Sequence, residues 1–112
     1  MSAPNIKTAI PLRRYQYGEF LLTVLGDIES DDPVGYRYIM AVATEGDAKP
    51  GLFISAERDA AAGYVLRASM ADGSQVLGSS EVFGDLERFV KEAMGVVATM
   101  LELSDEVPHQ LM

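Results

Sequence analysis

The chain has 112 residues, a length that favours one hydrophobic core and a single domain spanning residues 1–112. Hydrophobic residues make up 48% of the chain and charged residues 23%, a balance that excludes an intrinsically disordered protein. Seventeen acidic against nine basic residues give a formal charge of −8, which disfavours non-specific binding to nucleic acid, and the lack of cysteine excludes disulfides and thiolate metal sites.

Alternating apolar residues predict β-strands over the first three quarters of the chain. Residues 1–8 are expected to form a loosely ordered tail. Pro11 cannot donate a backbone hydrogen bond, so the first strand is expected at an edge or a bend. Asp72-Gly73 favours a tight hairpin turn between the last two strands. The predicted strands span residues 9–16, 19–28, 36–44, 52–57, 64–71 and 75–79.

The hydrophobic period changes from two to 3.6 residues at Asp85, which is a suitable helix N-cap. Residues 104–112, beyond the last apolar position, are expected to form a second loosely ordered tail. The sequence therefore predicts an α+β fold, in which an antiparallel sheet of five or six short strands is followed by one C-terminal amphipathic helix packed on one face. The apolar stripe of this helix comprises Leu86, Phe89, Val90, Ala93, Met94, Val97, Met100 and Leu101.

Residues with metal-binding or catalytic chemistry are sparse. His109 is the only histidine and has no neighbouring ligand or base. The run from Asp27 to Asp32 begins with the acidic spacing of a calcium loop, but Asp32 and Tyr38 replace the required Gly and Glu. A solvated acidic turn explains this run better. The sequence therefore predicts no catalytic residue, no cofactor and no metal site, and an enzymatic role is not favoured.

Arginines and tyrosines gather on two adjacent extended segments, as they do in sheets that bind single-stranded nucleic acid. Strand alternation, however, predicts Tyr36 and Tyr38 on one face and Arg37 on the other, and tyrosines with wet hydroxyls are common in sheet cores. This surface is a candidate for binding nucleic acid or another partner, with nucleic acid the less favoured of the two. Its residues are Arg13, Arg14, Tyr15, Tyr17, Tyr36 and Tyr38.

Apolar residues on both sides of the central strands point to self-association. Ile39 and Ala41 lie opposite Tyr38 and Met40 in the predicted pleat, and one helix is too narrow to cover both faces of the sheet. The leading interpretation is therefore a small self-associating domain, most simply a homodimer, that serves in protein–protein interaction or as an accessory or regulatory component. Neither a signal peptide nor an apolar run of ~18 residues is present, so a cytoplasmic location without membrane contact is expected.

Overall fold

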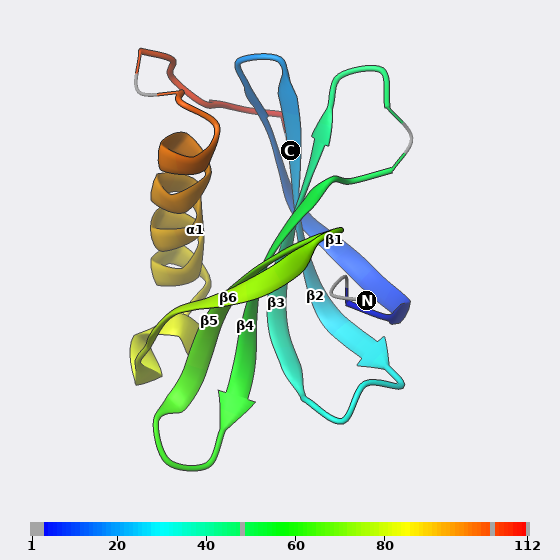
Figure 1. Ribbon diagram of the computed structural model, residues 1–112, viewed down its shortest axis with the longest axis vertical. Coiled ribbons are helices and arrows are strands. Elements are labelled where there is room, and N and C mark those ends of the chain that lie inside the picture. The colour runs from blue at the N-terminus through cyan, green and yellow to red at the C-terminus, as the bar shows by residue number, and fades with distance from the viewer. Residues whose placement is uncertain (1–3, 48, 104, 112) are drawn as a thin grey trace.

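The chain folds into an antiparallel sheet with one long helix packed against it (Figure 1). The computed structural model describes residues 4–47, 49–103 and 105–111. The strands neighbour one another in the order β6-β5-β4-β3-β2-β1-β7, so the first six form an uninterrupted meander. The elements are β1 (Ile6–Tyr17), β2 (Phe20–Ser30), β3 (Tyr36–Thr44), β4 (Leu52–Asp59), β5 (Gly63–Met70), β6 (Gly73–Ser79), the 3₁₀ helix η1 (Glu81–Gly84), α1 (Leu86–Met100) and β7 (His109–Gln110). The α+β class and the antiparallel sheet are therefore confirmed.

The number of strands differs from the prediction of five or six, because a seventh strand follows the helix. β7 is two residues long and pairs antiparallel with Tyr15 and Gln16 of β1. The backbone N–H of Leu111 then donates to the carbonyl of Arg14 over 2.7 Å. Two residues cannot display a hydrophobic period, so this strand forms only because the chain after α1 returns to the edge of β1.

The first strand is longer than predicted and begins inside the expected N-terminal tail. β1 runs for 12 residues from Ile6 and pairs with β2 along its length, with register shifts that include one between Pro11 and Arg13. Pro11 lies opposite Leu25 of β2, and in the described part of the chain no strand pairs with β1 on the other side at this position. Proline is tolerated at this edge position because no neighbouring strand needs the backbone N–H that proline lacks.

The helix covers one face of the sheet and forms the hydrophobic core with it. Asp85 caps α1 as predicted, because its carboxylate accepts a hydrogen bond of 3.1 Å from the backbone N–H of Arg88. Phe89 is fully buried, and its ring centroid lies 5.5 Å from that of Tyr38. Among the described residues, no helix is long and apolar enough to cross a membrane. The central residues of the core are Leu22, Val24, Met40, Ile54, Leu66, Phe89, Ala93 and Val97.

No helix covers the opposite face of the sheet among the described residues, yet the apolar side chains at the middle of this face are buried. Ile39 is fully buried and Ala41 is 9% exposed, although neither belongs to the core beneath α1. Leu21 of β2, which pairs with Ala43 of β3 on this face, is 37% exposed. The strands cross at steep angles in Figure 1, so the sheet is strongly twisted. A second copy is therefore not needed to cover the middle of this face.

Candidate functional site

The tyrosines proposed for a binding surface lie mostly in the core. Tyr15, Tyr17 and Tyr38 are between 6% and 8% exposed and belong to the cluster beneath α1. Their rings have no free face on which a nucleic-acid base could stack. These rings are buried because the alternation of side chains along β1 and β3 directs all three toward the helix.

Tyr36 departs from the predicted alternation. It pairs with Glu57 of β4 whereas Tyr38 pairs with the adjacent Ala56, so a β-bulge lies between the two tyrosines. Successive residues of β4 point to opposite faces, and Tyr36 and Tyr38 therefore do so too. Arg37 lies on the helix side, where its guanidinium carbon is 4.7 Å from the centroid of the Tyr38 ring. The predicted shared face of Tyr36 and Tyr38 is wrong, because one inserted residue reverses the alternation.

The two arginines of the candidate surface are also separated. Arg13 forms an ion pair with Glu87 at the start of α1 and donates a 3.5 Å hydrogen bond to the Tyr15 hydroxyl. The hydrogen bond to Glu87, followed by the one to Tyr15, raises the pKa of Arg13, and the bond from Arg13 lowers the pKa of Glu87. Arg14 is exposed and lies opposite Thr23, on the face away from the helix. The six candidate residues therefore do not form one surface.

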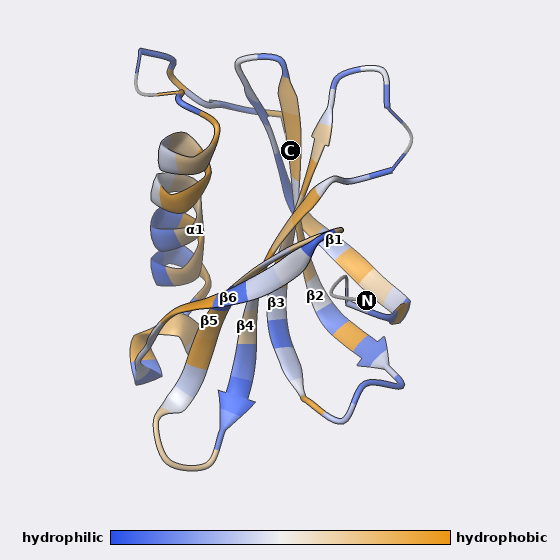
Figure 2. Ribbon diagram, viewed as in Figure 1, coloured by the Kyte–Doolittle hydropathy of each residue, from blue (hydrophilic) through white to orange (hydrophobic). Residues whose placement is uncertain are grey.

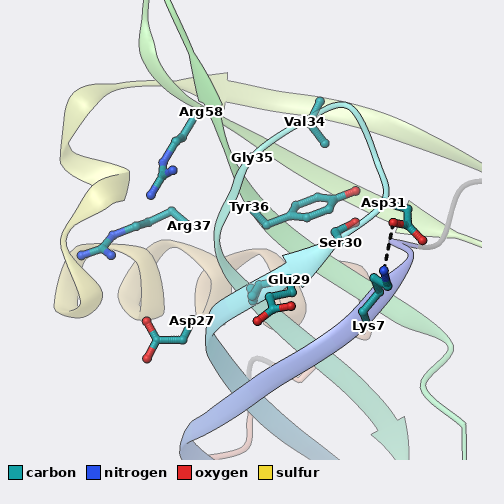
Figure 3. Close-up of a pocket in the computed structure, with 11 residues that line it drawn as sticks. Lys7, Asp27, Glu29, Ser30, Asp31, Val34, Gly35, Tyr36, Arg37 and Arg58 are labelled. Carbon is teal, nitrogen blue, oxygen red and sulfur yellow. Dashed lines mark ion pairs between the residues drawn. The ribbon is translucent and has the colours of Figure 1, made fainter.

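Hydrophilic residues gather at the end of the sheet where β2 ends, β3 begins and β4 ends (Figure 2). A cavity of about 490 Å³ lies there, which we call the charged pocket (Figure 3). On one side, the Lys7 ammonium lies 3.3 Å from the Asp31 carboxylate. On the other, the Arg37 Nε–H donates to the Gly84 carbonyl over 3.2 Å. The charged side chains that line the pocket are Lys7, Asp27, Glu29, Asp31, Arg37 and Arg58.

A hydrogen-bonded network centred on Asp32 lies beside this pocket and includes Tyr36, which lines it. The Tyr36 hydroxyl donates to Asp32 Oδ2 over 2.6 Å, and the backbone N–H of Asn5 donates to the same oxygen over 3.0 Å. These bonds, the backbone one first, lower the pKa of Asp32. Burial, followed by the bond to Asp32, raises the pKa of Tyr36. The network ties the N-terminal end of β1 to the turn between β2 and β3.

The acidic run from Asp27 to Asp32, which was considered as a calcium loop, contributes residues to this pocket. Its side chains are not arranged around a common cation site. Asp31 pairs with Lys7 and Asp32 accepts from Asn5 and Tyr36, so these two carboxylates already have partners. Across residues 4–47, 49–103 and 105–111, no three acidic, histidine or cysteine side chains are grouped to hold a metal ion.

A second hollow of about 490 Å³ runs between β6 and α1, and we call it the β6–α1 groove. Leu77, Val96 and Met100 provide apolar surface, with Lys91 and Glu92 at its border. At Gly95 an added Cβ would meet nothing within 4 Å, so the helix surface is open at that point. A smaller hollow of about 260 Å³ shares Met100 and Gln75 and extends to Met70, which is 38% exposed.

Sequence reasoning missed Arg58, Lys7 and the whole β6–α1 groove. Arg58 is an isolated charge at the end of a predicted strand, and nothing in its local pattern distinguishes it from a solvated residue. Its proximity to Arg37 depends on the pairing of β3 with β4, whose backbones are also joined where the Arg58 N–H donates to Gly35. Comparison of this chain with protein-family models, with curated proteins and with solved structures found no match.

Proposed function

We propose that the protein is a self-associating domain and that two copies join by pairing their β6 strands across a two-fold axis. The observation that carries this proposal is the outer edge of β6. This strand, Gly73–Ser79, pairs with β5 on one side and with no described strand on the other. Every second residue of an edge strand directs its N–H and C=O groups outward, where another strand can pair with them.

β6 lacks two of the features that prevent edge strands from pairing, charge and proline, although its pairing with β5 shifts register at Leu77. Its sequence, GSQVLGS, contains no charged residue and no proline. Val76 is at the centre of the strand and is 53% exposed. A symmetric antiparallel pair centred on this residue would place Val76 of each copy directly opposite the other, where the two side chains bury apolar surface.

The β6–α1 groove favours a second copy of the same chain as the partner. Two-fold symmetry brings the groove of each copy against the other, so Val96 and Met100 gain apolar contacts. Lys91 and Glu92 both line the groove, and the symmetric contact allows each lysine to approach the glutamate of the other copy. The nucleic-acid alternative has less support, because three of its four tyrosine rings lie in the core.

Light scattering coupled to size exclusion tests the proposal. The expected mass is twice the chain mass of 12.1 kDa, and Val76→Lys is expected to raise the dissociation constant tenfold or more, since it places two like charges opposite each other. Val107→Lys, at a position 69% exposed outside the sheet, is the matched control and should remain dimeric. A mass of 12.1 kDa at every protein concentration would contradict self-association.

The position of the axis has its own test because the chain contains no cysteine. Val76→Cys introduces a single thiol, and directly opposed strand residues have Cβ atoms about 5 Å apart, close enough for a disulfide after small adjustments. Mild oxidation should yield a covalent dimer from Val76→Cys much faster than from Val107→Cys. Equal rates in a dimeric protein would place the interface elsewhere.

A further inference from the structure

Two guanidinium groups in the charged pocket have no carboxylate partner among the residues that the structure describes. Within the described ranges of the chain, no acidic side chain lies within 4.0 Å of Arg37 or Arg58. Most basic side chains in the described ranges lack such a partner, and Arg37 and Arg58 differ from the other unpaired ones because both line the charged pocket. Arginines left together without a partner are suited to binding an anionic group, because the planar guanidinium presents several donors to a carboxylate.

The backbone and neighbouring groups hold Arg37 in position before any ligand arrives. Its Nε–H donates to the Gly84 carbonyl of η1, and its guanidinium carbon lies 4.7 Å from the centroid of the Tyr38 ring, so its terminal N–H groups remain available. Arg58 extends from the end of β4 toward the same side of the pocket in Figure 3. Pre-ordered donors lose less entropy when a ligand binds.

The same pocket also contains two carboxylates for which the described part of the chain provides no cationic partner. Asp27 and Glu29 line the cavity, and in the part of the chain that the structure covers no basic side chain lies within 4.0 Å of either. Asp27 has a backbone φ of 47°, in the left-handed region that few residues adopt. An anion attracted by the arginines would be repelled by these carboxylates, and a simple cation would be repelled by the arginines.

We infer that the charged pocket binds a small zwitterion, with its carboxylate on Arg37 and Arg58 and its ammonium group on Asp27 and Glu29. Such a ligand satisfies both pairs of charges at once. The cavity volume of about 490 Å³ is within the range of small-molecule sites, which is ~300 to 1,000 Å³. The charged pocket and the β6–α1 groove have no lining residue in common, so this inference does not depend on self-association.

Titration of the ¹⁵N-labelled protein, followed by amide chemical shifts, tests the ligand class. The probes are glycine, 3-aminopropanoate, 4-aminobutanoate and 5-aminopentanoate, which carry both charges at increasing separation. Glutarate and cadaverine have the five-carbon chain of 5-aminopentanoate but carry one sign of charge only. At least one zwitterion should shift the amides of Gly35 and Arg37 in a saturable way and bind about tenfold more tightly than glutarate and cadaverine.

Variants distinguish the pocket from general charge effects. Arg58→Gln removes an exposed guanidinium that makes no side-chain hydrogen bond to any described residue. Asp27→Asn replaces a carboxylate by an amide, and Asn also tolerates the positive φ at this position. Each should weaken the preferred zwitterion about tenfold, while Arg14→Gln, at an exposed position outside every pocket described above, should leave its affinity unchanged. The inference is wrong if no zwitterion gives a saturable shift, if glutarate or cadaverine binds as tightly, or if Arg14→Gln weakens binding equally.

Discussion

The face of the sheet that α1 covers and the face that it leaves bare bury their side chains in different ways. Beneath the helix, the buried residues are apolar or aromatic, and Phe89 packs among them with no exposed surface. On the bare face, Ser55, Glu57 and Ser69 are buried beside Ile39 and Ala41. One face is therefore stabilised by packing, and the other also depends on hydrogen bonds and paired charge.

The centre of the polar face is an ion pair in β4 and β5. The Arg67 Nε–H donates to both carboxylate oxygens of Glu57, over 3.1 and 3.2 Å, and the Ser55 hydroxyl donates to one of them over 3.1 Å. A further Arg67 nitrogen lies 3.4 Å from the Ser74 hydroxyl of β6. Because the Glu57 side chain is 8% exposed, its charge must be compensated by these neighbours and not by water.

The largest effect is expected on the helix-covered face. Phe89→Ala should lower the free energy of unfolding by ~3 to 5 kcal/mol, because it removes a fully buried ring and leaves a cavity against Tyr38. Urea denaturation at fixed protein concentration measures this. Arg88→Ala, an exposed position on the same helix, serves as the control and should change the stability by less than about 0.5 kcal/mol. Equal midpoints for the two variants would contradict the packing described for α1.

A smaller effect is expected on the bare face. Arg67→Met leaves the buried Glu57 carboxylate without its cation and should cost ~2 kcal/mol, less than for a fully buried pair because the Arg67 side chain is 33% exposed. Adding Glu57→Met should restore part of the loss, since an apolar pair requires no compensation. Urea denaturation of the natural protein, both single variants and the double variant gives the free energies of unfolding for a double-mutant cycle. Strict additivity would show that the two charges do not interact.

The smallest effect is expected from Asp32, which lies beside the charged pocket and accepts a hydrogen bond from Tyr36. Its pKa is lowered in the folded protein, so the carboxylate stabilises the fold above its unfolded pKa of about 3.9, and this contribution is lost as the pH falls through the folded value. The stability difference between the natural protein and Asp32→Asn should therefore be constant near neutral pH and shrink below about pH 4. Unfolding measured in steps from pH 7 to pH 2.5 tests this. If the stability difference between the two proteins grew toward low pH, the predicted lowering of the Asp32 pKa in the folded state would be contradicted.

The contrast between the faces was only partly predictable from the chain. Helical spacing identified the stripe around Phe89 and Val97, and both are fully buried. Simple alternation predicted Tyr36 and Tyr38 on the same face of the sheet. A β-bulge places them on opposite faces, because one extra residue in β3 reverses the direction of every preceding side chain. The buried Glu57–Arg67 pair joins residues ten positions apart across a hairpin, and neither residue differs locally from a solvated charge.

Local patterns in the amino-acid sequence were sufficient for the antiparallel strands and the capped helix, since each depends on residues within a few positions of one another. The turn predicted at Asp72-Gly73 instead lies at Ala71-Asp72, because Gly73 already pairs with Met70. The seventh strand, the charged pocket and the β6–α1 groove required the folded chain. β7 forms where the C-terminal segment meets β1. Arg37 and Arg58 line the same pocket because β3 pairs with β4, and β6 is an edge because no described strand continues the sheet beyond it. These features depend on contacts between distant segments, and such contacts leave no periodic signal in either segment.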